Sequence, residues 1–248
     1  MDVATSGAWL GAAPTAWLAL TVLAYLFTWE IYRRAGNSPF LLPALTGSAL
    51  IVAALLLTGT DYADYYQHTR PIHFLIGPAI VLLAVPLYGQ LKRLRSVWLP
   101  VTVALLAGSV TAIASAILIG WSLGATWQTL WSLAPKSSTM PIGMAVSEQT
   151  GGLAALTALA TAITGISGAI ASPWVMRWLA PPAQAAEDDE AAKQREMTEG
   201  FALGLVAHAI GTARALQTSE TAGAFAALAM ILNGIATALF ILVGLAWL

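Results

Sequence analysis

The sequence predicts an all-α integral membrane protein with about seven or eight transmembrane segments, some of them interrupted or re-entrant, in a single transmembrane domain over residues 1–248. Hydrophobic residues make up 58% of the chain and charged residues 9%, and the mean hydropathy is +0.75. Charged residues make up roughly 25% of soluble domains, so a water-soluble fold could not hide this much apolar surface. Prolines, glycines and polar stretches divide the apolar runs, which predicts interrupted helices.

Composition and motifs exclude several classes of function. The formal net charge is −1, which argues against nucleic acid or another polyanion as a partner. The chain has no cysteine, which removes disulfides, thiolate catalysis and cysteine-ligated metals. It also lacks a phosphate-binding loop, an H-E-x-x-H metal pattern and a G-x-S-x-G nucleophile motif. We therefore expect no enzyme activity, no metal and no cofactor.

The first half of the chain begins with a predicted span at residues 9–34, which ends in two arginines that mark a cytoplasmic end. Residues 38–121 supply three more apolar segments and form the first of two predicted repeats. The middle segment contains Pro78 and Pro86, which would free backbone carbonyl groups inside the membrane. This segment is therefore predicted to be interrupted.

The second predicted repeat covers residues 125–248 and contains a polar break near its start. Residues 125–134 are amphipathic and too short to cross a membrane, and they lead into the stretch PKSSTMPIGMAVSEQTGG at 135–152. Such sequence is tolerated at membrane depth only where it is buried in protein or lines a cavity. Further along, hydrophilic residues at 180–198 predict a mobile cytoplasmic linker.

Charge positions predict the orientation of the chain. With the N-terminus outside and residues 125–149 entering and leaving on one face, all but three of the eleven lysines and arginines are cytoplasmic. The exceptions are Arg70, Lys136 and Arg214. On this path the two repeats run in opposite directions, so the sequence predicts an inverted repeat. Paired interrupted segments in inverted halves indicate a transporter site near the middle of the membrane.

The polar break predicts a binding site for a small anion. Lys136, Ser137, Ser138 and Thr139 combine a cation with hydroxyl groups just before a helix expected to start near Pro141. Helix N-termini add free N–H groups and about half a positive charge. The alternative is that Lys136 extends to the membrane interface and keeps its charge in water. The chemistry of these residues leaves both interpretations open.

A second candidate site is HAIGTAR, at residues 208–214. His208 can carry a proton, Gly211 adds flexibility, and Thr212 and Arg214 offer a hydroxyl and a guanidinium to a carboxylate. The alternative is that Arg214 lies at the membrane edge and His208 packs in the core through one hydrogen bond. Ionisable residues inside a membrane are functional candidates by default, which favours the site.

Glu148 is predicted to couple protons to the site, together with His208. A carboxylate inside the membrane either pairs with a cation, such as Lys136 or Arg214, or takes up a proton because burial disfavours its charged form. Helix breaks would let such a site open alternately to the two sides. The predicted helix breaks are Pro78, Pro86, Pro135, Pro141 and Gly211.

Several motifs resemble those of the LrgB/CidB family of bacterial inner-membrane proteins. They are FLIGPAIVLLAVPLYGQ at 74–90, PKSSTMPIGMAVSEQTGG at 135–152, and HAIGTARA at 208–215 followed by TSETAGAFAALAM. The resemblance covers nearly the whole chain from about residue 38 and implies a multi-pass protein of the bacterial inner membrane. The family motif residues that it carries onto this sequence are Pro135, Lys136, Ser137, Thr139, Pro141, Glu148, Gly151, Gly152, His208, Gly211, Thr212 and Arg214.

The resemblance implies two different functions. Bacterial members are described as holin-like or antiholin-like regulators of murein hydrolase export and cell lysis, acting beside a small LrgA/CidA-type partner. A related plastid inner-envelope protein is a glycolate/glycerate translocator, and some bacterial members are linked to pyruvate movement.

Because Lys136, His208 and Arg214 lie at breaks in apolar segments, the sequence favours the transporter. We expect a secondary transporter of small monocarboxylates such as glycolate, glycerate or pyruvate, coupled to protons, in which Lys136 and Arg214 hold the carboxylate. The alternative is the holin/antiholin-like regulator. In either case we expect a homo-oligomer in the lipid bilayer.

Overall fold

The structure is a computed structural model that describes residues 14–179 and 189–245, and the regular elements in these residues are all helices. Five helical stretches of the described residues are long and apolar enough to cross a membrane, which confirms an all-α membrane protein. They are Thr15–Arg34, Arg70–Gly89, which is interrupted at Leu75 and Leu83, Trp98–Ser122, Ala154–Leu179 and Glu220–Gly244. Helix α3 (Pro43–Thr58) is apolar but shorter than these five, so fewer of the described helices reach full length than expected. The chain divides into two compact units after Leu82, and the inverted repeat stays a prediction.

In the first unit, helix α2 (Pro14–Arg34) packs against α3 and against α4 (Tyr62–His68). The fully buried Trp17 meets the ring of Tyr65 edge-on, with ring centroids 5.6 Å apart. Helix α2 contains most of the first predicted span, whose residues 9–13 lie outside the described residues.

Four short helices follow in the chain, and three of them carry a proline in their first turn. They are α5 (Arg70–Phe74), α6 (Ile76–Leu82), α7 (Ala84–Gly89) and α8 (Leu91–Ser96). Proline suits the first turn of a helix, where its missing N–H is not needed, but it clashes with the preceding turn if the helix continues. Pro78 and Pro86, two of the predicted break residues, accordingly lie just after the interruptions at Leu75 and Leu83.

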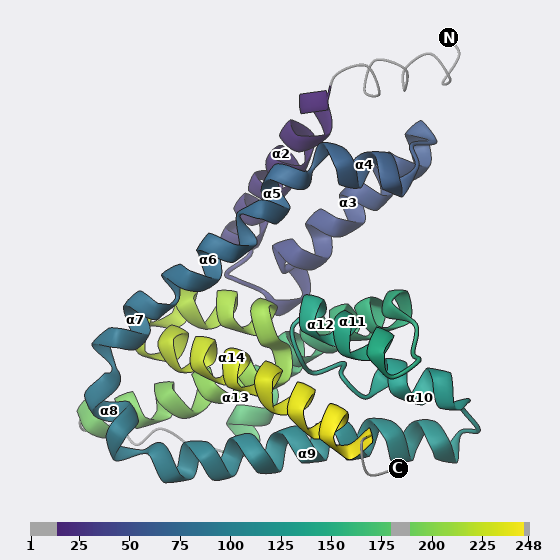
Figure 1. Ribbon diagram of the computed structural model, residues 1–248. Helices are drawn as coiled ribbons and strands as arrows, with labels where there is room; N and C mark the ends of the chain where they lie inside the picture. Colours follow the sequence, from purple (N-terminus) through teal and green to yellow (C-terminus); the bar gives the residue numbers. More distant parts are fainter. Residues whose placement is uncertain (1–13, 180–188, 246–248) are drawn as a thin grey trace. The chain divides into compact units, whose positions relative to one another are not determined.

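The second unit contains the longest helices and both polar segments of the candidate site (Figure 1). Its further helices are α9 (Trp98–Ser122), α10 (Trp127–Leu133), α11 (Met140–Gln149), α12 (Ala154–Leu179), α13 (Asp189–Thr218) and α14 (Glu220–Leu245). The predicted mobile linker, 180–198, falls partly on residues 180–188, outside the described residues. From Asp189 onward the chain is helical, so the rest of that stretch belongs to α13.

Helix α13 folds back on itself at His208. The backbone angles of His208 are φ 39° and ψ −124°, which are not helical, and such a conformation costs roughly 1–3 kcal/mol in a residue other than glycine. We call residues 189–207 the first arm of α13 and residues 209–218 its second arm. Leu203 and Ala215, one from each arm, belong to the same buried cluster, although they would lie about 18 Å apart along a straight helix.

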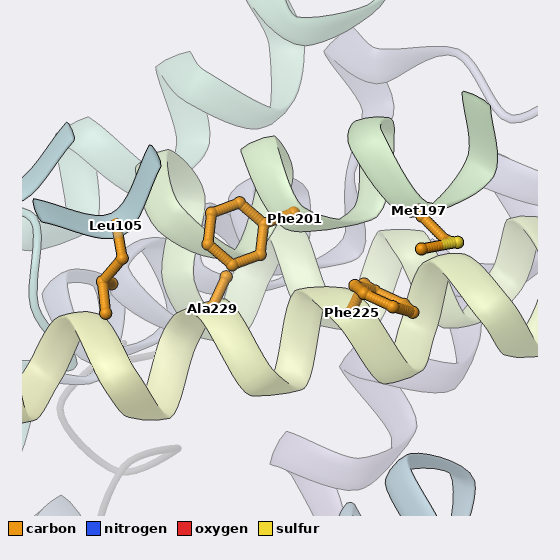
Figure 2. Close-up of a cluster of buried hydrophobic side chains, with 5 residues drawn as sticks. All are labelled: Leu105, Met197, Phe201, Phe225 and Ala229. Atoms are coloured by element: carbon orange, nitrogen blue, oxygen red, sulfur yellow. The ribbon is translucent and has the colours of Figure 1, made fainter. Parts of the chain in front are cut away.

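The first arm of α13 lies directly against α14 because two glycines leave no side chain between the helices. A methyl group at Gly200 or Gly204 would overlap the backbone of Ala222 or Ala226. Small residues allow such close approach between membrane helices. Beside this contact, apolar side chains from α9, α13 and α14 form a buried cluster, shown in Figure 2: Leu105, Met197, Phe201, Phe225 and Ala229.

Candidate functional site

The polar break predicted at residues 135–152 forms a helical hairpin made of α10 and α11. Thr126 caps α10 by accepting a hydrogen bond from the N–H of Thr129 at 3.3 Å. The chain then turns over residues 134–139, the hairpin turn, and re-enters a helix with Pro141 in its first turn. Both helices are too short to cross a membrane.

Ser132, near the end of α10, holds this hairpin onto α12. Its carbonyl accepts from the hydroxyl of Thr157 at 2.8 Å, and its own hydroxyl accepts from the N–H of Leu153 at 2.7 Å. A methyl group at Gly152 would lie 2.9 Å from the Ser132 nitrogen, so only glycine fits there. The sequence did not single out Ser132, because a serine in a short amphipathic helix forms no distinctive pattern.

Lys136 lies in the hairpin turn. Its side chain is half-buried, and its Nζ donates to the hydroxyl of Ser137 at 3.3 Å. None of the salt bridges in the described part of the chain involves Lys136. Ser137 and Ser138 are buried, and the Ser138 hydroxyl donates to the Pro135 carbonyl at 2.8 Å. The hydroxyl of Thr139, at the N-cap of α11, makes no capping hydrogen bond.

At the break in α13, the imidazole of His208 is buried against α12. Its Nε2–H donates to the carbonyl oxygen of Thr161 at 3.0 Å. A side chain at Gly165 would overlap the imidazole ring, so glycine at this position makes room for His208. This arrangement matches the alternative in which His208 packs in the core through one hydrogen bond. The hydroxyl of Thr161 is also buried and has no partner in the part of the chain described.

Gly211 does not break the helix, contrary to the prediction. The non-helical angles occur three residues earlier, at His208. Gly211 instead lets the two arms of α13 meet, because a methyl group there would overlap the carbonyl of Leu203 in the first arm. Thr212 is buried, and its hydroxyl donates to the carbonyl of His208 at 2.8 Å, which closes the first turn of the second arm.

Arg214 binds a backbone carbonyl that a proline has left without its helical donor. Its Nη1 donates to the carbonyl of Ala169 in α12 at 2.7 Å. In an ordinary helix that carbonyl accepts from the fourth residue along, which here is Pro173 and has no N–H. No salt bridge found within 14–179 and 189–245 includes Arg214. The guanidinium therefore has a neutral partner in this conformation.

The two broken segments meet at a side chain that the sequence reasoning missed, Asn233 of α14. Its Nδ2 donates to the carbonyl of Ser137 at 2.7 Å and to the carbonyl of Leu205 at 3.2 Å. Its Oδ1 accepts from the hydroxyl of Ser109 in α9 at 2.6 Å. Ser137 belongs to the hairpin turn and Leu205 to the first arm of α13. An amide inside a long apolar helix is unusual, and that signal could have found it.

Not all the predicted site residues come together. Glu148 is exposed near the C-terminal end of α11, and this helix separates it from the hairpin turn by about 15 Å. Among the described residues Glu148 pairs with neither Lys136 nor Arg214. The expectation of a buried Glu148 therefore does not hold, because the residue falls on an exposed face of α11. Lys136 and Arg214 also have separate neutral partners rather than a common one.

Comparisons with known proteins identify the family. The model of the LrgB-like family matches residues 21–247. The uncharacterized protein YxaC of Bacillus subtilis is 32% identical over 223 residues, which cover 90% of this chain and 91% of that protein. An uncharacterized protein of Haemophilus influenzae is 34% identical over 217 residues, 87% of this chain and 88% of that protein.

Relatives with a functional name are more distant. The holin-like protein CidB of Staphylococcus aureus is 28% identical over 224 residues, which cover 90% of this chain and 92% of that protein. No solved structure matches the chain. The family match and the long apolar helices agree that this is a multi-pass membrane protein, and the chain belongs to the LrgB-like family.

Proposed function

We propose that the protein is a secondary transporter that carries small monocarboxylates across the bacterial inner membrane by alternating access. The observation that carries this proposal is the meeting of the hairpin turn and the break in α13 at Asn233. Secondary transporters build their substrate sites from interrupted helices that meet inside the membrane domain. Irregular backbone at membrane depth is tolerated only inside protein or along a cavity.

The two cations Lys136 and Arg214 favour a negatively charged substrate over a neutral one. Each has a neutral oxygen as its hydrogen-bond acceptor, the Ser137 hydroxyl for Lys136 and the Ala169 carbonyl for Arg214. A carboxylate is a better acceptor for these cations than either oxygen, because its full negative charge adds a Coulomb attraction that a neutral hydroxyl or carbonyl lacks. A small monocarboxylate such as glycolate, glycerate or pyruvate would therefore displace these partners.

Proton coupling is assigned to His208 rather than to Glu148 in this proposal. His208 lies at the break itself, and its Nε2 is already committed to the Thr161 carbonyl. A proton taken up at Nδ1 would leave that bond in place and add a positive charge at the break. The exposed position of Glu148 gives no comparable link to the broken segments. The proposal involves no enzyme activity, metal or cofactor, and it includes a homo-oligomer in the bilayer.

Uptake of labelled pyruvate, glycolate and glycerate into proteoliposomes that contain the pure protein tests the proposal. We expect saturable uptake by the wild type, and loss of most of this uptake in Lys136→Met and Arg214→Ala. Arg177→Ala is the matched control, because Arg177 is an exposed arginine of α12 whose guanidinium also donates to a backbone carbonyl. Normal uptake by both site variants would refute the role of the two cations.

A second candidate function is a holin-like or antiholin-like role in murein hydrolase export and cell lysis. The names of the CidB relatives favour this candidate over transport, whereas the meeting of the two breaks favours the transporter. On this account the protein would act beside a small LrgA/CidA-type partner and form lesions by self-association. Release of an encapsulated large dye from the same proteoliposomes, without saturable uptake of any monocarboxylate, would favour this second candidate.

A further inference from the structure

Asn233 lies near the middle of α14 and is only 1% exposed. A buried amide is stable only when its donors and acceptor have partners. The carbonyl oxygens of Ser137 and Leu205 can only accept, so the NH₂ end of the amide must face them. The hydroxyl of Ser109 donates to the other end and holds the amide in this orientation.

The two carbonyls bonded to Asn233 belong to two different broken segments. In an unbroken helix the carbonyl of Leu205 would accept from the N–H of residue 209, but the break at His208 interrupts this pattern. Ser137 lies in the hairpin turn, between two helices. One NH₂ group therefore satisfies one carbonyl from each segment, and it does so from a third helix.

We propose that Asn233 is a positioning residue that couples the hairpin turn to the break in α13, so that the two segments rearrange together. Neither segment can move away from α14 without losing its hydrogen bond to Nδ2, which would leave buried polar groups unsatisfied. Because Ser109 anchors the amide to α9, the amide cannot simply follow one segment. The consequence for transport rests on the proposed function, whereas the coupling itself does not.

Four variants separate the parts of this coupling. Asn233→Asp keeps an acceptor for Ser109 but has no N–H for the carbonyls, and even its protonated form can donate to only one of them. Asn233→Leu removes donors and acceptor together at similar volume. Ser109→Ala removes only the anchor on α9. Thr237→Val is the matched control, because Thr237 lies one turn further along α14 and is similarly buried.

Hydrogen–deuterium exchange of the full chain in lipid nanodiscs measures the coupling without a substrate. We expect both substitutions of Asn233 to raise amide exchange at least about tenfold in residues 134–139 and in residues 203–211, the scale expected from losing two hydrogen bonds. Ser109→Ala should have a smaller effect on both segments, and Thr237→Val should have none. Faster exchange in one segment alone, in neither, or equally throughout α9 and α12 would overturn the proposal.

Pyruvate uptake distinguishes failure of this inference from failure of the proposed function. If the segments must move together, Asn233→Asp should lower the maximal rate about tenfold or more while KM changes much less, because the conformational step is slowed. If the wild type takes up no monocarboxylate, the transporter proposal fails and the exchange measurement still decides the coupling. If the wild type transports and Asn233→Asp has the same maximal rate, the proposed coupling is wrong.

Discussion

The hairpin turn and the break in α13 interrupt helices in two different ways. The hairpin turn is encoded locally: Pro135 lies near its start, Pro141 lies in the first turn of the helix that follows it, and the Ser138 hydroxyl bonds back to the Pro135 carbonyl. Helix α13 contains no proline, and its break is held by contact between its own two arms and by contacts with other helices of the second unit. Those contacts are Leu203 with Gly211, His208 with Gly165, and Leu205 with Asn233.

This difference indicates which of the two segments is easier to rearrange. A turn fixed by its own prolines keeps its shape when distant residues change. A break that depends on tertiary contacts can open or close when those contacts change, and it is therefore the better candidate for the moving part of a transporter. Three substitutions test the contrast.

The largest effect is expected at Gly211. An added methyl group would overlap the carbonyl of Leu203, so Gly211→Ala should push the two arms of α13 apart and lower the free energy of unfolding by about 3 kcal/mol. Thermal unfolding of the purified protein in detergent measures this loss. Gly244→Ala is the matched control, because nothing lies within 4 Å of its added methyl group. If Gly211→Ala unfolds at the same temperature as the wild type, close contact between the two arms does not hold the break in α13.

An intermediate effect is expected at Arg214. Arg214→Ala removes the donor to the Ala169 carbonyl, which should cost about 1–3 kcal/mol of stability. Pro173→Ala would return a backbone N–H to the same carbonyl, so the double variant should regain most of the stability lost by the single one. Uptake of pyruvate should remain low in the double variant if Arg214 binds the substrate. Recovery of both stability and uptake would mean that Arg214 serves only to donate a hydrogen bond to the Ala169 carbonyl of α12.

The smallest effect is expected at Pro141. Proline in the first turn of α11 only favours a conformation that the hairpin turn already adopts, so Pro141→Ala should lower stability by less than about 1 kcal/mol. The same thermal unfolding measurement compares it with Gly211→Ala. A loss as large as that of Gly211→Ala would remove the contrast between a locally encoded turn and a break held by tertiary contacts.

The fold class and the hairpin turn could be predicted from the sequence, but the position of the break in α13 could not. Prolines and a lysine between apolar runs show directly that the segment around Lys136 is irregular. The sequence around His208 is compatible with a continuous helix, and Gly211 is the more obvious breaking residue. Only the packing of the two arms shows that the reversal occurs at His208.

The candidate site was predicted less completely than the fold. The chemistry of Lys136 and Arg214 stood out, but the bond between Arg214 and Ala169 depends on Pro173, which lies far away in the sequence. Asn233 was visible as an amide in an apolar run, but its importance depends on which carbonyls lie beside it. Distances between segments remote in the sequence decide such sites, and local patterns do not contain them.

If the protein transports by the proposed route, the hairpin turn and the break in α13 meet and must rearrange during each cycle. The chain has no native cysteine, so a Ser137→Cys/Leu205→Cys pair can be treated with a short bismaleimide in proteoliposomes, with each single variant as control. We expect efficient cross-linking of the pair, because the backbone carbonyls of both residues bond to the same Asn233 amide, and we expect pyruvate uptake then to stop. Absence of cross-linking, or full uptake by the cross-linked protein, would contradict this expectation.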